Sequence, residues 1–286
     1  MRFKAFLFSL FLVIFSLTSD TRAVRPASKW ATLEGNKIHY YDIGSSKADN
    51  ALVLEHGWTC NADFWKHNYD AFPGYRVIAL DLPGHGRSDK PKLNYSMEHF
   101  AKAINAVMKN AGVKRAVLVG HSMGTPVARQ FYRLYPDRTL GIVVVDGTLR
   151  SVFSKAAMEE FFAPLKTDYK TNAAKFVDGM LTSVKDEPLR ASIRESMLAT
   201  PDYVGISAMD GMIDDKIWTD DKITVPVLAV MAPSPFWPKD LKEKYTEIAP
   251  NIDFQIWADV SHFLHMEKPR EFNEAVKTFV VGNKLL

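Results

Sequence analysis

Short apolar runs alternate with stretches of helical periodicity along most of this chain. The apolar runs lie at residues 37–44, 51–57, 75–84, 115–120, 141–147, 225–232 and 253–259. Helices are expected around 62–72, at 96–112 and 123–135, near 238–248, and from about Pro269 onward. Strands this uniformly apolar are typical of sheets with both faces covered. The alternation therefore predicts an α/β fold with a mostly parallel sheet and crossover helices.

The alternation stops between Leu149 and Lys222, where no strand-like run occurs. This segment is helical in character and rich in Met and Phe. We interpret residues 150–222 as a helical cap inserted into one core, which residues 24–149 and 223–286 build. Most of the apolar side chains in the cap are expected to pack its own helices, and the others to line an acyl pocket.

The first 23 residues have the layout of a secretory signal peptide. Arg2 and Lys4 precede the apolar run AFLFSLFLVIFSL, and a polar segment follows that ends at Ala23 in a loose small-x-small site. The run is too short to span a bilayer comfortably. We expect a secreted or periplasmic protein without stable membrane insertion after cleavage, and a membrane-anchored one if the segment stays uncleaved.

Composition narrows the class of protein. Of the 286 residues, 47% are hydrophobic and 24% are charged, which suits a globular chain with a real core. The formal net charge of +3 gives no reason to expect a nucleic-acid partner. Cys60 is the only cysteine, so no internal disulfide is possible, and we expect it to be a packing residue. No His/Cys cluster indicates a metal site, and no cofactor is implied.

The stretch GHSMG, residues 120–124, places a serine between two glycines at the end of an apolar run. It reads G-x-S-x-G, with a strand expected before it and a helix after it. Such a sharp turn projects the hydroxyl of Ser122 out of the sheet, and the small glycines avoid collision with neighbouring backbone. Ser122 is therefore the candidate nucleophile, and the N–H of Met123 is a candidate donor to an oxyanion.

A second motif, EHGWTC, follows the apolar run at residues 51–54. Gly57 allows a close approach of the loop, and the backbone N–H of Trp58 is the candidate second donor of an oxyanion hole. The alternative interpretation is that Gly57 only turns the chain.

The candidate base lies late in the chain. ADVSHFLHMEKP contains His262 and His265, and no histidine occurs in the cap. His262 directly follows the apolar run at 253–259, where a loop brings it towards Ser122, so it is favoured over His265.

Together these stretches resemble the α/β-hydrolase superfamily of esterases, lipases and epoxide hydrolases. HGW, DLPGHGRSDKP, GHSMG and SHFLHMEKP occur in the expected order, and the resemblance covers about residues 30–286. It implies an eight-stranded sheet with helices on both faces and a Ser–acid–His triad. In the second stretch, Asp81 and His85 are expected to be turn and packing residues.

The triad acid departs from the family pattern. Such proteins usually carry it in a G-x-x-D signature after the strand written here as PVLAVMA. Ala232 replaces that glycine, Pro235 stands about where the acid belongs, and Asp240 is expected to begin the next helix. Some related hydrolases, haloalkane dehalogenases among them, carry the acid one strand earlier, which corresponds to Asp146 here.

We therefore predict Asp146 as the acid that orients His262. Three alternatives stay open: Asp146 only caps a turn, Asp259 serves although it lies close to His262 along the strand, or no acid acts.

The predicted function is hydrolysis of a small-molecule carboxylic ester through an acyl-enzyme on Ser122. Lactone or amide opening, carbon–carbon bond hydrolysis and perhydrolysis are alternatives on the same triad. A ligand-binding homologue without catalysis is the alternative from another class. The sequence does not indicate the acyl length or the oligomeric state.

Overall fold

The computed structural model describes residues 26–45 and 47–286, so the signal peptide expected over 1–23 lies outside the described residues. The strands are β1 (Ser28–Leu33), β2 (Asn36–Ile43), β3 (Asn50–Glu55), β4 (Val77–Leu80), β5 (Arg115–His121), β6 (Thr139–Val145), β7 (Val227–Met231) and β8 (Ile252–Ile256). The α-helices are α1 (Met97–Asn110), α2 (Gly124–Leu134), α3 (Lys155–Thr167), α4 (Tyr169–Met180), α5 (Glu187–Leu198), α6 (Asp202–Ile213), α7 (Leu241–Ile248), α8 (Leu264–Glu267) and α9 (Pro269–Gly282). Short 3-10 helices are η1 (Ala62–Trp65), η2 (Pro136–Arg138) and η3 (Asp215–Ile217).

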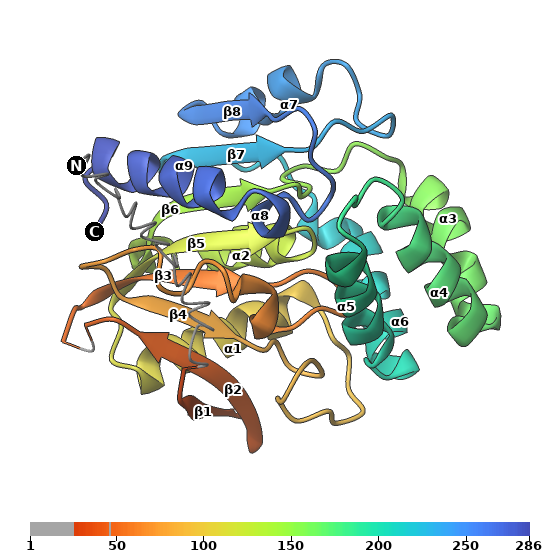
Figure 1. The fold of residues 1–286 in the computed structure, drawn as a ribbon, viewed down its shortest axis with the longest axis horizontal. Helices are drawn as coiled ribbons and strands as arrows, with labels where there is room; N and C mark the ends of the chain where they lie inside the picture. The colour runs from red at the N-terminus through yellow and green to blue at the C-terminus, as the bar shows by residue number, and fades with distance from the viewer. Residues whose placement is uncertain (1–25, 46) are drawn as a thin grey trace, which may run out of the picture.

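All eight strands form one sheet in the order β1-β2-β4-β3-β5-β6-β7-β8. The pairs β1–β2 and β2–β4 are antiparallel, and every other pair is parallel. Because β3 to β8 run in the same direction, their carboxyl ends share one edge of the sheet, on the right in Figure 1. The predicted fold class, an eight-stranded and mostly parallel sheet with helices on both faces, is confirmed.

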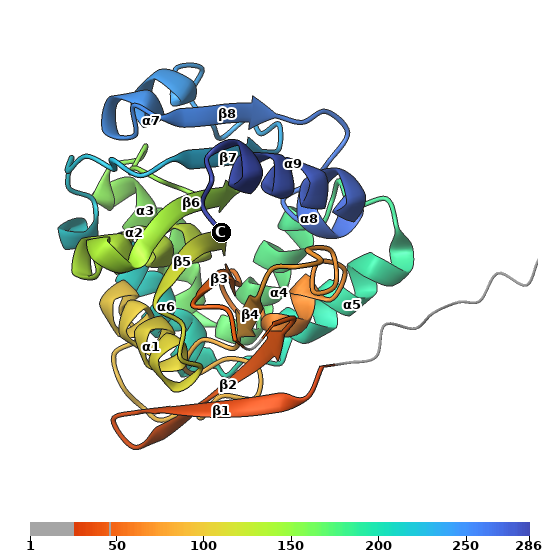
Figure 2. The ribbon, with the colours of Figure 1, turned by 90° about the vertical axis from the view of Figure 1, so that its left-hand side faces the viewer.

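Helices cover both faces of the sheet, which explains the wholly apolar strands. Helices α1, α2 and α7 lie on one face, and α8 and α9 lie on the other (Figure 2). Neighbouring side chains of β5 divide between the two layers: Leu118 packs into the apolar cluster that includes α1 and α2, and Val119 into the cluster that includes α9. Both side chains are fully buried. Because successive side chains of a strand point to opposite faces of the sheet, this one strand contributes side chains to both apolar clusters.

Four helices, α3 to α6, form between β6 and β7 (Figure 1). They lie beyond the carboxyl ends of β3 to β8, so they cover the edge at which parallel α/β sheets bind ligands. Helices α3, α4 and α5 bury only two side chains each, in α4 Ala173 and Val177, whereas half of the residues of α6 are buried. We keep the name cap for residues 150–222. No helix within residues 26–45 and 47–286 has both the length and the apolar character needed to cross a membrane.

Two local elements differ from the sequence expectations. Strand β1 was not predicted, because it is an edge strand with only Ala31 buried and shows no apolar run. It pairs with β2 through a two-residue loop, Glu34-Gly35, in which both residues have positive φ, as tight hairpins require. The helix expected at 62–72 is limited to the 3-10 turn η1. Successive turns, rather than a helix, bury the Trp65 and Tyr69 rings against the sheet.

Candidate active site

Ser122 lies in a strained turn between β5 and α2. Its φ is +52°, a left-handed conformation that is uncommon for residues other than glycine, and its N–H donates to the Val145 carbonyl at 3.0 Å. A Cβ on Gly120 would lie 2.5 Å from the Gly124 backbone, and a Cβ on Gly124 would lie 2.6 Å from the Glu55 carbonyl oxygen. Both positions therefore require glycine, and the turn holds Ser122 at the carboxyl edge of the sheet.

His262 and Asp146 meet at this edge. His262 lies in the loop after β8, and its Nδ1 is 2.7 Å from Asp146 Oδ2. The second carboxylate oxygen of Asp146 accepts a hydrogen bond from the Ala232 N–H at 2.9 Å. The Asp146 side chain is only 6% exposed, whereas that of His262 is 23% exposed. A fixed, buried carboxylate on Nδ1 leaves Nε2 of a partly open imidazole available for proton transfer.

The other candidate acids lie elsewhere. Asp240 precedes α7, is exposed, and pairs with Lys244 at 2.7 Å. Asp259 is also exposed. Pro235 stands where the family pattern places its acid, and three residues earlier the Ala232 N–H donates to Asp146 from the adjacent strand.

His265 lies in a different environment from His262. Its side chain is fully buried, neither ring nitrogen has a hydrogen-bond partner in the described part of the chain, and its ring centroid lies 4.3 Å from that of Trp65. Burial, with a smaller contribution from neighbouring histidines, lowers the pKa of His265 to about 3. A neutral ring in the apolar core is a packing group.

The two predicted oxyanion donors belong to Met123, which follows Ser122 in the chain, and to Trp58, which follows Gly57 beside the Ser122 side chain. Trp58 follows β3, and Met123 begins the turn into α2. Within residues 26–45 and 47–286, neither of these backbone N–H groups donates a hydrogen bond. A Cβ on Gly57 would lie 3.1 Å from Ser122 Cβ and 3.0 Å from His121 Nδ1, so a side chain there would crowd the nucleophile. Gly57 thus lets the Trp58 loop approach Ser122 closely.

His121 is a positioning group that the sequence analysis missed. Its Nε2 lies 2.8 Å from the carbonyl oxygen of His262, and the ring centroids of the two residues are 4.8 Å apart. A carbonyl only accepts, so Nε2 carries the proton. Burial, reinforced by His265 and His262, holds the pKa of His121 well below its usual value, so the ring stays neutral. His121 thereby fixes the loop of His262 without adding charge beside it.

Glu55 is a second buried group beside the Ser122 turn. It ends β3, and neither carboxyl oxygen has a hydrogen-bond partner in the described part of the chain. Burial raises its pKa well above the usual value and so favours the protonated form of the carboxyl.

The DLPGHGRSDKP stretch builds a loop beneath the cap. The Asp81 carboxylate accepts hydrogen bonds from His39 Nδ1 and from the backbone N–H groups of Ala62 and Arg87. Burial opposes its ionisation, yet these three bonds hold the pKa of Asp81 below its usual value. His85 is fully buried, and burial lowers its pKa to about 3. Both side chains hold the loop together.

An aromatic cluster connects Trp58 to the cap. The Trp58 ring lies 5.5 Å from that of Phe176 on α4, and Phe162 on α3 lies 5.6 Å from Phe176. Phe161 extends the cluster outward and is 55% exposed. Nearby, Cys60 is buried, and burial raises the pKa of its thiol, so it stays protonated. No group of three or more His, Cys, Asp or Glu side chains suited to a metal ion occurs in the described residues.

Comparisons with known proteins agree with this fold. The family profile described as alpha/beta hydrolase fold matches residues 50–187. A 2-hydroxy-6-oxononadienedioate/2-hydroxy-6-oxononatrienedioate hydrolase of Paraburkholderia phymatum is 29% identical, over 87% of this chain and 93% of its own. The structure of Est816, described as an N-acyl homoserine lactone degrading enzyme, is 25% identical with a TM-score of 0.74, covering 88% of this chain and 100% of its own.

The esterase EaEST from Exiguobacterium antarcticum shares the fold at 20% identity, with a TM-score of 0.77 and coverage of 89% and 99%. The motif order, the sheet order and the family profile all lead to one conclusion. The chain belongs to the α/β-hydrolase superfamily.

Proposed function

We propose that the chain is a serine hydrolase that cleaves small carboxylic esters at Ser122. The observation that carries this proposal is the 2.7 Å contact between His262 Nδ1 and Asp146 Oδ2, at the strand end adjacent to the Ser122 turn. A carboxylate on Nδ1 fixes the imidazole tautomer and stabilises the imidazolium that forms during attack. The left-handed Ser122 turn, and the Trp58 and Met123 N–H groups that donate no hydrogen bond in the described residues, support the same assignment.

The reaction runs in two halves. In the first, Ser122 Oγ forms a bond to the ester carbonyl carbon while His262 Nε2 takes the hydroxyl proton. The N–H groups of Trp58 and Met123 bind the developing oxyanion. The alkoxide leaving group departs with the proton from His262, which leaves an acyl group on Ser122.

In the second half, a water molecule replaces the alcohol. His262 takes a proton from the water, which attacks the acyl carbon through a second oxyanion. The bond to Ser122 Oγ breaks, and His262 returns the proton to the serine, so the carboxylic acid leaves and the enzyme is restored.

The names of two relatives, Est816 and the Paraburkholderia hydrolase, suggest reactions to compare with ester hydrolysis. A lactone is an internal ester, so the activity in the name of Est816 is consistent with the same steps. The name of the Paraburkholderia hydrolase refers to an oxo-dicarboxylate and not to an ester. Carbon–carbon bond hydrolysis beside a ketone is therefore the second candidate. Amide opening and perhydrolysis, and ligand binding without catalysis, are further outcomes of the test.

A fluorophosphonate probe followed by peptide mass spectrometry tests the nucleophile. We expect a covalent adduct on Ser122 and none on the Ser122→Ala variant. p-Nitrophenyl esters of graded acyl length, lactones, amides and a 2-hydroxy-6-oxo-dicarboxylate then rank the substrate classes. Absence of labelling together with absence of turnover on every substrate would overturn the proposal and favour a binding protein.

A further inference from the structure

The loop that carries the Trp58 N–H is tied to the cap by three hydrogen bonds. They run from Trp58 Nε1 to the Gly205 carbonyl at 2.8 Å, from Thr200 Oγ1 to the Thr59 carbonyl at 3.0 Å, and from Asn61 Nδ2 to Ser196 Oγ at 2.7 Å. The partners are separated by 135 to 147 residues along the chain. Helices α5 and α6, with the linker between them, therefore contact the same short segment, residues 58–61, which we name the donor loop.

The donor loop has an unfavourable backbone conformation at its centre. Cys60 N–H donates to the Gly57 carbonyl at 3.2 Å and closes a turn in which Thr59 has a φ of +55°. For a β-branched residue this is a strained conformation, and such strain persists only where surrounding contacts impose it. The Thr59 hydroxyl is buried without a partner in the described part of the chain, so its side chain does not stabilise the turn. The side-chain hydrogen bond to its carbonyl comes from Thr200.

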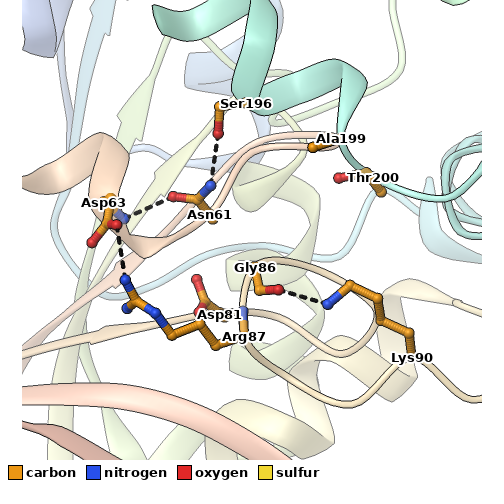
Figure 3. A pocket seen from close by; sticks show the side chains of 9 residues that line it. All are labelled: Asn61, Asp63, Asp81, Gly86, Arg87, Lys90, Ser196, Ala199 and Thr200. Atoms are coloured by element: carbon orange, nitrogen blue, oxygen red, sulfur yellow. Dashed lines mark hydrogen bonds and ion pairs between the residues drawn. The ribbon is translucent and has the colours of Figure 1, made fainter.

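Ring contacts with the cap hold the Trp58 end of the donor loop, whereas the Asn61 end borders a pocket. A pocket of about 240 Å³ separates the donor loop and the 81–90 loop from the end of α5 (Figure 3). Asn61 and Thr200 line it, and the dashed line in Figure 3 marks the bond between Asn61 and Ser196 across its upper side. Trp58, Thr59 and Cys60 are buried, so at the Asn61 end, where the pocket interrupts the contact with the cap, directional hydrogen bonds add to the packing that positions the loop.

We propose that Thr200 is a positioning residue that aims the Trp58 N–H at the oxyanion, so that the cap forms part of the oxyanion hole and does more than cover it. This inference rests on the proposed function. Thr200 is 7% exposed and contacts neither Ser122 nor His262 by any hydrogen bond in the described residues, so it acts only through the donor loop. Oxyanion donors stabilise the transition state and not the bound ester, because the full negative charge develops during attack.

The test compares Thr200→Val, which removes the hydroxyl and keeps the side-chain shape, with Thr200→Ser, which restores it. We expect Thr200→Val to lower kcat by about tenfold or more with KM within about twofold. This loss is smaller than the roughly 10²- to 10³-fold effect of deleting an oxyanion donor. The rate of fluorophosphonate labelling falls in parallel, since the phosphoryl oxygen uses the same donors. Thr200→Ser recovers most of both rates.

A pH profile separates positioning of the donor from damage to the base. Thr200→Val should lower the plateau of the kcat/KM profile without moving its apparent pKa, because Thr200 does not touch His262. Thr182→Val is the matched control, since the Thr182 hydroxyl makes a bond of the same kind, 3.0 Å to the Gly179 carbonyl, within the cap alone. It should leave kcat, KM and the labelling rate unchanged.

The outcomes distinguish this inference from the proposed function. If the unaltered protein neither labels nor turns over any substrate, the proposed function fails. If it reacts but Thr200→Val matches it, or changes KM alone, Thr200 does not position the donor and the inference is wrong. Should Thr200→Val not fold, Ser196→Ala removes the neighbouring bond to the donor loop, and the same kcat, KM and labelling criteria then decide.

Discussion

The sheet and the cap differ in how fully their side chains are buried. Strands β3 to β7 are almost fully buried, and the side chains of helix α1 fill the layer beside them. In the cap, by contrast, α3 buries only Phe162 and Leu165, and α5 only Ile193 and Met197. The cap meets the core through individual hydrogen bonds and rings as well as through packing. Close packing surrounds the groups that do the proposed chemistry, and hydrogen bonds and ring contacts join the cap to the donor loop.

The largest expected effect lies in the core. Replacing Asp146 with Asn keeps the shape of the side chain but removes the charge that selects the His262 tautomer. We expect kcat to fall by about 10⁴-fold, as for other triads, with little change in melting temperature. The equivalent exchange in the cap, Asp210→Asn, breaks only an exposed ion pair with Lys166 and should leave kcat intact. Near-normal turnover by Asp146→Asn would assign the acid to another residue.

Alanine substitutions at one glycine of the core and at one glycine of the cap compare how tightly the two regions are packed. In Gly124→Ala, the new methyl lies 2.6 Å from the Glu55 carbonyl oxygen, so the Ser122 turn must shift. We expect a loss of about 1–3 kcal/mol in unfolding free energy and most of the activity. In Gly179→Ala, on cap helix α4, the methyl meets nothing within 4 Å. That variant should gain about 0.4–1 kcal/mol, because alanine restricts the unfolded chain.

Urea denaturation and ester turnover, measured on both glycine variants under one set of conditions, give the two quantities together. Equal stability changes in Gly124→Ala and Gly179→Ala would contradict the difference in packing between core and cap.

The last comparison concerns the dependence of stability on pH. The cap contains no histidine, whereas the core buries His265 with a pKa of about 3 against an ordinary value of 6.5. Between these values the unfolded chain binds a proton that the folded chain does not. Stability from this group is therefore complete above pH 6.5 and is lost as pH falls towards 3. Glu55 acts in the opposite direction: because burial raises its pKa, its contribution to stability is lost as pH rises above its ordinary 4.5.

His265→Leu isolates the histidine contribution. Between pH 6.5 and 5, we expect the slope of unfolding free energy against pH to be lower in this variant by up to about 1.4 kcal/mol per pH unit. Phe161→Ser, an exposed change in the cap, serves as the control and should keep the original slope. Identical slopes for all three proteins would show that His265 is protonated equally in both states.

Much of the fold followed from local patterns, and the confirmed sheet shows why. Apolar runs identified β2 to β8 because each is covered on at least one face, whereas β1 is an exposed edge and carries no such run. The donor and nucleophile motifs were visible because each lies within a few consecutive residues.

Contacts between distant residues left no such signal. The bond from Thr200 to Thr59 joins residues 141 positions apart, and nothing near either residue indicates it. The same holds for the bond from His121 to the carbonyl of His262, also 141 positions apart. The proposed roles of Ser122, His262 and Asp146 stay predictions until the variants are measured.

The hydrogen bond from the Ala232 N–H to Asp146 has a consequence for redesigning the specificity of the protein. With the acid at the end of β6, the hydrogen bond that the described residues after β7 make to the triad acid is the one from the Ala232 N–H. That segment, residues 233–240, contains three prolines, and its Phe236 side chain is 67% exposed. Insertions or grafted recognition sequences at this place would leave the reacting groups where they are, which makes it a natural entry point for engineering new specificity into the protein.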